Sequence, residues 1–103
     1  MCSSDLWEAA AIDSMRTLNR LACETALRIS GLTGHSVHGA TDITGFGLLG
    51  HAREMALASN VTLQIDHFQV EALPGAREAI ALGAVPGGLK NNKEFASCSV
   101  ELG

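Results

Sequence analysis

Residues 41–51 read TDITGFGLLGH, a polar segment followed by a glycine-rich turn and the start of an apolar helix. The first amide groups of a helix lack acceptors within it, and together with the helix dipole they favour an anion there. Gly45 and Gly47 have no Cβ, so the backbone can closely approach a bound group. Asp42 precedes the turn and offers a carboxylate to a cation that accompanies the anion. The stretch therefore indicates a binding site for a phosphate group with its metal ion.

The segments on either side of this stretch predict a strand–helix–strand unit. Ser36–Ala40 is a weak strand candidate, and Val61–Ile65 is a clearer one because apolar and polar residues alternate along it. The helix between them is expected over Phe46–Ser59, with Asn60 as a left-handed stop. Such units have parallel strands in nearly all cases. Two strands rarely stand alone, so we expect another copy of the chain to complete the sheet, or a larger domain to contain it.

A long helix is expected before this unit, over Leu6–Ser30. Asp5 is the expected N-cap, and Gly31 is the expected left-handed residue beyond the end. An apolar stripe along the helix predicts packing, and Cys23 is expected to be a small buried residue within the helix. The stripe comprises Trp7, Ala11, Met15, Leu18, Ala22 and Ile29.

Two short helices are expected after the unit, over Ala76–Leu82 and Leu89–Phe95, each preceded by a turn that contains proline and glycine. The end of the chain, residues 96–103, carries no clear signal. The sequence thus predicts an α+β fold, in which a long N-terminal helix, a β-α-β unit and short helices form a single domain over residues 1–103.

Composition excludes several classes of function. The 103 residues suffice for one small domain, and a net charge of −4 argues against nucleic-acid binding, which needs a basic face. No apolar run reaches the roughly 18 residues of a membrane span. The 3 cysteines are widely spaced and suggest neither a zinc motif nor a disulfide framework. With no signal peptide in view, the expected location is the cytoplasm.

The glycine pattern leaves other interpretations open. Gly45, Gly47 and Gly50 match the spacing of a dinucleotide fingerprint, and Asp66 follows at about the usual offset of roughly 20 residues. The polar segment before the turn argues against it, because a central parallel strand is normally an apolar run. A Walker-type loop is excluded, since no Gly-Lys-Ser/Thr is present. Alternatively, Asp42 and its neighbours are simply turn and cap residues, with the glycines allowing close packing.

The same stretch closely resembles the central motif of selenophosphate synthetases (selenide, water dikinases). It is similar to their C-terminal domain, the kind shared with aminoimidazole ribonucleotide synthetases. Further similar segments occur in the same order, and the resemblance covers about residues 5–103. These segments are MRTLNR at 15–20, LPGA at 73–76, GAVPGG at 83–88 and the pair Asn91-Asn92.

This resemblance implies an enzyme that transfers the γ-phosphoryl group of ATP to selenide and releases AMP and phosphate, with selenophosphate feeding selenium metabolism. It implies that Asp42 helps to hold Mg²⁺ on the ATP phosphates, a role suited to a hard oxygen ligand. Thr41, Thr44, Gly45 and Gly47 would shape the cofactor-binding site around that metal. The implied cofactors are therefore Mg²⁺ and ATP, the latter as substrate of the intact enzyme.

Other matched positions carry less chemistry. His51 lies one turn into the expected helix, where we expect a structural hydrogen bond in preference to a catalytic base. Gly87, Gly88 and Asn91 match a loop of the family to which no chemistry is assigned here.

The resemblance also implies that a large part of the enzyme is missing. The family's N-terminal domain carries the reactive cysteine or selenocysteine, a catalytic lysine and further metal-binding aspartates, and no segment here matches it. Residues 1–103 thus resemble a truncated C-terminal domain, expected to be inactive alone. Its partners would be ATP and selenide in the intact enzyme, with a possible homodimer and with neither nucleic acid nor membrane. A non-catalytic binding or self-assembly module is the alternative, and a dinucleotide-binding unit is the lesser one.

Overall fold

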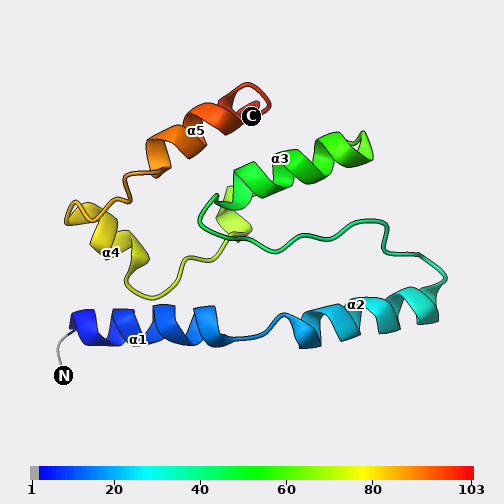
Figure 1. The fold of residues 1–103 in the computed structure, drawn as a ribbon, viewed down its shortest axis with the longest axis horizontal. Coiled ribbons are helices and arrows are strands. Elements are labelled where there is room, and N and C mark those ends of the chain that lie inside the picture. Colours follow the sequence, from blue (N-terminus) through cyan, green and yellow to red (C-terminus); the bar gives the residue numbers. More distant parts are fainter. Residues whose placement is uncertain (1–2) are drawn as a thin grey trace. The chain divides into compact units, whose positions relative to one another are not determined.

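The computed structural model describes residues 3–103, and every regular element within them is a helix (Figure 1). The described residues form two compact units. The first holds residues 3–18 and 65–86, and the second holds residues 19–64 and 87–103. No helix in residues 3–103 combines the length and the apolar character needed to cross a bilayer.

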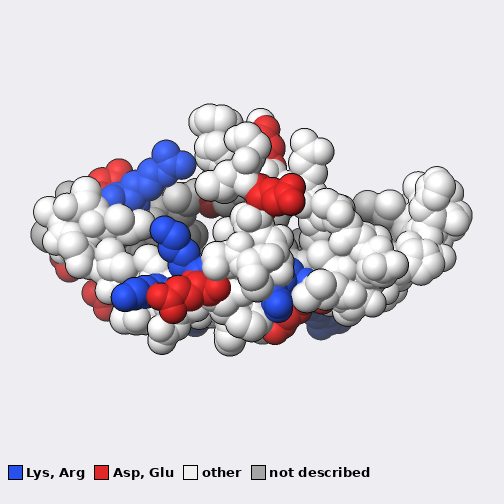
Figure 2. Space-filling model, turned by 90° about the horizontal axis from the view of Figure 1, so that it is seen from above, with Lys and Arg blue, Asp and Glu red and all other residues white. Residues whose placement is uncertain are grey.

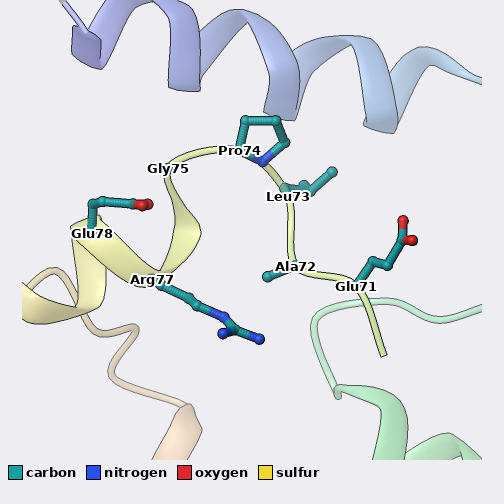
Figure 3. Close-up of a pocket in the computed structure, with 7 residues that line it drawn as sticks. All are labelled: Glu71, Ala72, Leu73, Pro74, Gly75, Arg77 and Glu78. Carbon is teal, nitrogen blue, oxygen red and sulfur yellow. The ribbon is translucent and has the colours of Figure 1, made fainter. Parts of the chain in front are cut away.

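The first unit contains α1 (Ser3–Arg16), the short 3-10 helix η1 (His67–Gln69) and α4 (Ala76–Ala81). Its central contact joins Trp7 of α1 to Gly75, the residue before α4. A Cβ at Gly75 would overlap the indole ring, and the φ of 83° at Gly75 also favours glycine. Figure 3 shows the backbone at Gly75 next to the ribbon of a helix, with Pro74 beside it.

The second unit contains α2 (Arg20–Thr33), α3 (Leu48–Ser59) and α5 (Leu89–Ser97). Helices α3 and α5 lie side by side (Figure 1). The two buried residues of the described chain, Gly50 and Ala96, belong to this pair. This packing confirms the helix predicted after the glycine motif, and Asn60 ends it with a left-handed φ of 53° as predicted.

The prediction of one long N-terminal helix is wrong, because α1 ends at Arg16 and α2 begins at Arg20. Thr17 turns its hydroxyl back to the carbonyl oxygen of Asp13 at 2.7 Å, and Asn19 is the N-cap residue of α2. Threonine and asparagine compete for backbone hydrogen bonds and therefore favour helix ends over helix interiors.

The predicted ends of that helix also differ from the structure. Helix α1 starts at Ser3, so Asp5 lies in its first turn and is not the cap before it. Gly31 lies inside α2, and the left-handed C-cap is the next glycine, Gly34, with a φ of 71°. In the structure, α1 begins before Asp5 and α2 continues past Gly31, so each helix extends further at that end than predicted. The two short helices α4 and α5 confirm the predictions for residues 76–82 and 89–95.

The two predicted strands do not form in the described residues. The amide of Val37 donates to the Ser30 hydroxyl at 3.3 Å, and that of Val61 donates to the Ala56 carbonyl at 3.0 Å. Neither segment pairs with another strand, and without a ladder partner an isolated strand is not stable, so these exposed segments stay irregular. Of the predicted α+β class, residues 3–103 therefore show only the helical part.

Large apolar side chains remain exposed throughout both units. In the predicted apolar stripe, Met15 is 77% and Leu18 78% exposed, and Cys23, expected to be buried, is exposed as well. Figure 2 shows a face on which charged side chains are separated by broad uncharged areas. The described residues thus lack the hydrophobic core that the composition allowed.

Candidate functional site

A tight turn precedes α3 at the glycine motif. The amide of Gly47 donates to the Thr44 carbonyl at 2.9 Å, which leaves Gly45 and Phe46 at the centre of the turn. Gly47 is the N-cap of α3, with a φ of 86° that other residues rarely adopt, and no side chain caps the helix. Because the first amide groups of a helix have no acceptors within it, those that follow Gly47 can receive an anion.

Thr44 and His51 are joined across this turn. The Thr44 hydroxyl and His51 Nε2 lie 2.9 Å apart, and His51 Nδ1 lies 3.9 Å from a carboxylate oxygen of Glu54. The Thr44 hydroxyl can donate to Nε2 or accept from it, depending on the tautomer of the ring. The structural hydrogen bond predicted for His51 is confirmed.

Asp42 lies in the exposed segment before the turn. Its carboxylate makes no hydrogen bond and no ion pair with any residue in 3–103, and the neighbouring Thr41 donates its hydroxyl to the Asp42 carbonyl at 2.9 Å. No cluster of three or more His, Cys, Asp or Glu that could hold a metal occurs in the described residues. At this position the described residues therefore offer a cation one free carboxylate, outside any group of three or more such ligands.

A hollow of about 370 Å³ lies between residues 38–41 and α3. Its polar lining includes His38, Thr41, His51 and Glu54. Two predicted positions, Thr41 and His51, therefore border the same open space.

Helix α5 contacts the turn of the motif from a distant part of the sequence. Asn92 Nδ2 donates to the Gly45 carbonyl at 3.0 Å, and the ring of Phe95 meets the edge of Phe46 at a centroid distance of 5.6 Å. Sequence reasoning assigned no role to Asn92, although it follows Asn91 in a segment that matches the family. Asn91 itself is exposed, and Gly88 is the N-cap of α5.

A second polar cluster lies at the end of α5. The guanidinium of Arg53 lies 4.5 Å above the ring of Phe95, and its Nε donates to the Ser99 hydroxyl at 2.9 Å. Cys98 Sγ is 3.7 Å from the same hydroxyl. The hydrogen bond with Ser99, together with Arg53, lowers the pKa of the Cys98 thiol. No sequence pattern indicated this cluster, because its members are brought together by the packing of α3 on α5.

The first unit has a hollow of its own, of about 360 Å³, which is lined by residues between positions 71 and 78 (Figure 3). Glu71, Arg77 and Glu78 supply its charged groups. Asp66, the candidate ribose ligand of a dinucleotide site, accepts a hydrogen bond from the Phe68 amide at 3.0 Å and so caps η1. The strands that a dinucleotide-binding unit requires do not form in the described residues.

Comparison of the sequence with known proteins finds one matching family model and several curated relatives. The profile of the family described as AIR synthase related protein, C-terminal domain, matches residues 6–88. Among curated proteins, the chain is 41% identical to "Selenide, water dikinase" of Caldanaerobacter subterraneus subsp. tengcongensis over 92% of its length. It is 42% identical to the protein of that name from Porphyromonas gingivalis over 92% of its length, and 40% identical to that of Pelobacter propionicus over 100%.

The chain spans only 26%, 25% and 28% of these three relatives, respectively. Comparison with the solved structures finds no significant match.

Proposed function

The chain belongs to the family of the AIR synthase related protein, C-terminal domain, and from that premise we propose that it is part of a selenide, water dikinase. The intact enzyme would convert ATP, selenide and water to selenophosphate, AMP and phosphate, in the cytoplasm. The observation that carries the proposal is the uncapped start of α3, preceded by the free carboxylate of Asp42, within a segment that matches the family.

In this proposal Asp42 supplies one ligand to Mg²⁺ on the ATP phosphates. Mg²⁺ is usually held by one or two carboxylates together with phosphates and water, so a single free carboxylate fits the role. Gly45 and Gly47 keep the backbone close to the phosphate, and Thr41 borders the site. Thr44 acts through His51, because its hydroxyl is already engaged there. Bound Mg²⁺ would neutralise charge on the phosphates, which is the main requirement of phosphoryl transfer.

We propose that the chain alone is inactive. The described residues contain no group of three or more His, Cys, Asp or Glu that could hold a metal, and the chain covers about a quarter of the length of the relatives. With ATP, Mg²⁺ and selenide, phosphate release by the isolated chain should therefore not exceed background. Turnover above background would refute the fragment interpretation.

The metal role of Asp42 is tested by binding, since turnover is not expected. Asp42→Asn should weaken binding of Mg²⁺–ATP by at least about tenfold, because even indirect metal contacts are worth that much. Asp13→Asn makes the same change of charge in α1 and should leave the dissociation constant unaltered. Equal dissociation constants for the two variants, measured by calorimetry, would remove Asp42 from the site.

A second candidate function is self-assembly, favoured by the exposed apolar surface. Val61, Leu63 and Ile65 are exposed on the segment where a strand was predicted, and unpaired segments of this kind favour pairing with another chain. A homodimer could complete the sheet that one chain does not form. Sedimentation would detect it, and a stable monomer at high concentration would contradict it.

A further inference from the structure

One hydrogen bond connects the turn of the motif to a residue 47 positions away. Asn92, in the first turn of α5, donates from its side-chain amide to the Gly45 carbonyl at 3.0 Å. We propose that Asn92 is a positioning residue that fixes the turn at residues 44–47, and through it the start of α3. Its part in phosphate binding rests on the proposed function, whereas its hold on the turn does not.

The turn needs such support because its own residues hold it weakly. Gly45 and Gly47 are more flexible than other residues, and the turn contains one backbone hydrogen bond, from the Gly47 amide to the Thr44 carbonyl, while the Thr44 hydroxyl bonds to His51 at one end of the turn. A Cβ at either glycine would meet nothing within 4 Å, so packing at these positions does not restrict them. Asn92 supplies a restraint from outside the turn, at the carbonyl between Thr44 and Phe46.

Packing around Asn92 places α5 for this contact. The rings of Phe46 and Phe95 meet edge to face, with an interplanar angle of 73°, and the Arg53 guanidinium covers the Phe95 ring. Phe46 also lies over Gly50, where a Cβ would come within 3.0 Å of its ring. The Phe46 ring contacts both Gly50 of α3 and Phe95 of α5, and these contacts fix the position of Asn92 relative to the turn.

The consequence for binding is orientation of the α3 amides. Free amide groups bind an anion only when they point to a common place, and a mobile turn would spread them over many directions. By holding Gly45, Asn92 keeps the N-cap residue Gly47 and the following amides aligned. Asn92 therefore acts without touching the phosphate.

The test compares three variants of the full chain. Asn92→Ala removes the donor, and Asn92→Asp keeps the size but places a carboxylate against the carbonyl. Asn91→Ala is the matched control, because that side chain is exposed and has no hydrogen bond. Exchange of the Gly47 amide, followed by NMR, should become about fivefold faster in both Asn92 variants, the effect of one lost hydrogen bond. The Gly83 amide, bonded to Ile80 in the first unit, provides the internal reference.

Binding of Mg²⁺–ATP to the same variants separates the two proposals. The dissociation constant should rise about fivefold in both Asn92 variants and stay constant in Asn91→Ala. Unchanged Gly47 exchange in Asn92→Ala and Asn92→Asp would overturn the positioning role outright. Faster exchange with an unaltered dissociation constant would overturn its part in binding. Faster exchange in a chain that binds no Mg²⁺–ATP even as wild type would refute the Mg²⁺–ATP role proposed for the residues of this chain and leave the hold on the turn established.

Discussion

Phe95 should provide most of the attachment of α5 to α3 and to the turn that precedes α3. An edge-to-face pair of rings is worth about 0.5–1.5 kcal/mol beyond the area it buries. Phe95 is 41% exposed, so Phe95→Ala also forfeits roughly three fifths of a full burial, about 1–2 kcal/mol. Loss of the Arg53 contact adds about 0.5–1 kcal/mol. We therefore expect Phe95→Ala to destabilise the α3–α5 pair by about 2–4 kcal/mol.

A double-mutant cycle isolates the ring contact from these other losses. Phe46→Ala, Phe95→Ala and the double variant should give a coupling of about 1 kcal/mol in the free energy of local opening, measured by amide exchange within α3. Phe68→Ala is the control, because that ring is 84% exposed in the first unit and its removal should leave α3 unaltered. Effects of the two single substitutions that add exactly, with no coupling, would refute the packing of α5 on the motif.

Two further outcomes follow from contacts elsewhere in the chain. Gly75→Ala should destabilise the first unit by about 1–3 kcal/mol, because alanine is strained at a φ of 83° and its Cβ would meet the indole of Trp7. A red shift in tryptophan fluorescence would report this loss of stability, and an unaltered spectrum would contradict the contact. The lowered pKa of Cys98 means that its thiolate forms at lower pH, so its alkylation should reach half-maximal rate below the pH found for a free model thiol. Ser99→Ala should raise that midpoint pH, and an equal midpoint in the variant and the wild type would exclude Ser99 as the cause.

Local chemistry explains the parts of the fold that the sequence predicted correctly. Asn60 ends α3 because asparagine tolerates a left-handed backbone. The start of this helix was predicted two residues early, at Phe46, because the φ of 86° at Gly47 keeps that residue outside the helix. The break after Arg16 was equally local, but the apolar stripe continues through Leu18 and concealed it. Thr17 and Asn19 were the available signals, since both residue types favour helix ends.

The parts that sequence reasoning missed depend on contacts between distant residues. The bond from Asn92 to Gly45 and the cluster of Arg53 with Ser99 join α5 to residues more than 40 positions away, and no periodic pattern within a segment encodes them. The contact of Trp7 with Gly75 is of the same kind, since the stripe indicated that Trp7 packs but not against what.

The predicted strands show why a correct pattern can still fail to give an element. A helix satisfies its backbone within itself, whereas a strand requires a neighbour for every second amide and carbonyl. Val61–Ile65 has the alternation of a strand, but no ladder partner forms in the described residues, and its apolar side chains stay exposed. The alternation therefore places apolar side chains on one face of residues 61–65, and this face would be buried only by pairing with another strand. If that partner is a second copy, Leu63→Asp should abolish the dimer in sedimentation, whereas Thr62→Asp on the opposite face of the same segment should preserve it. Equal loss of the dimer in both variants would show that pairing does not follow the strand register.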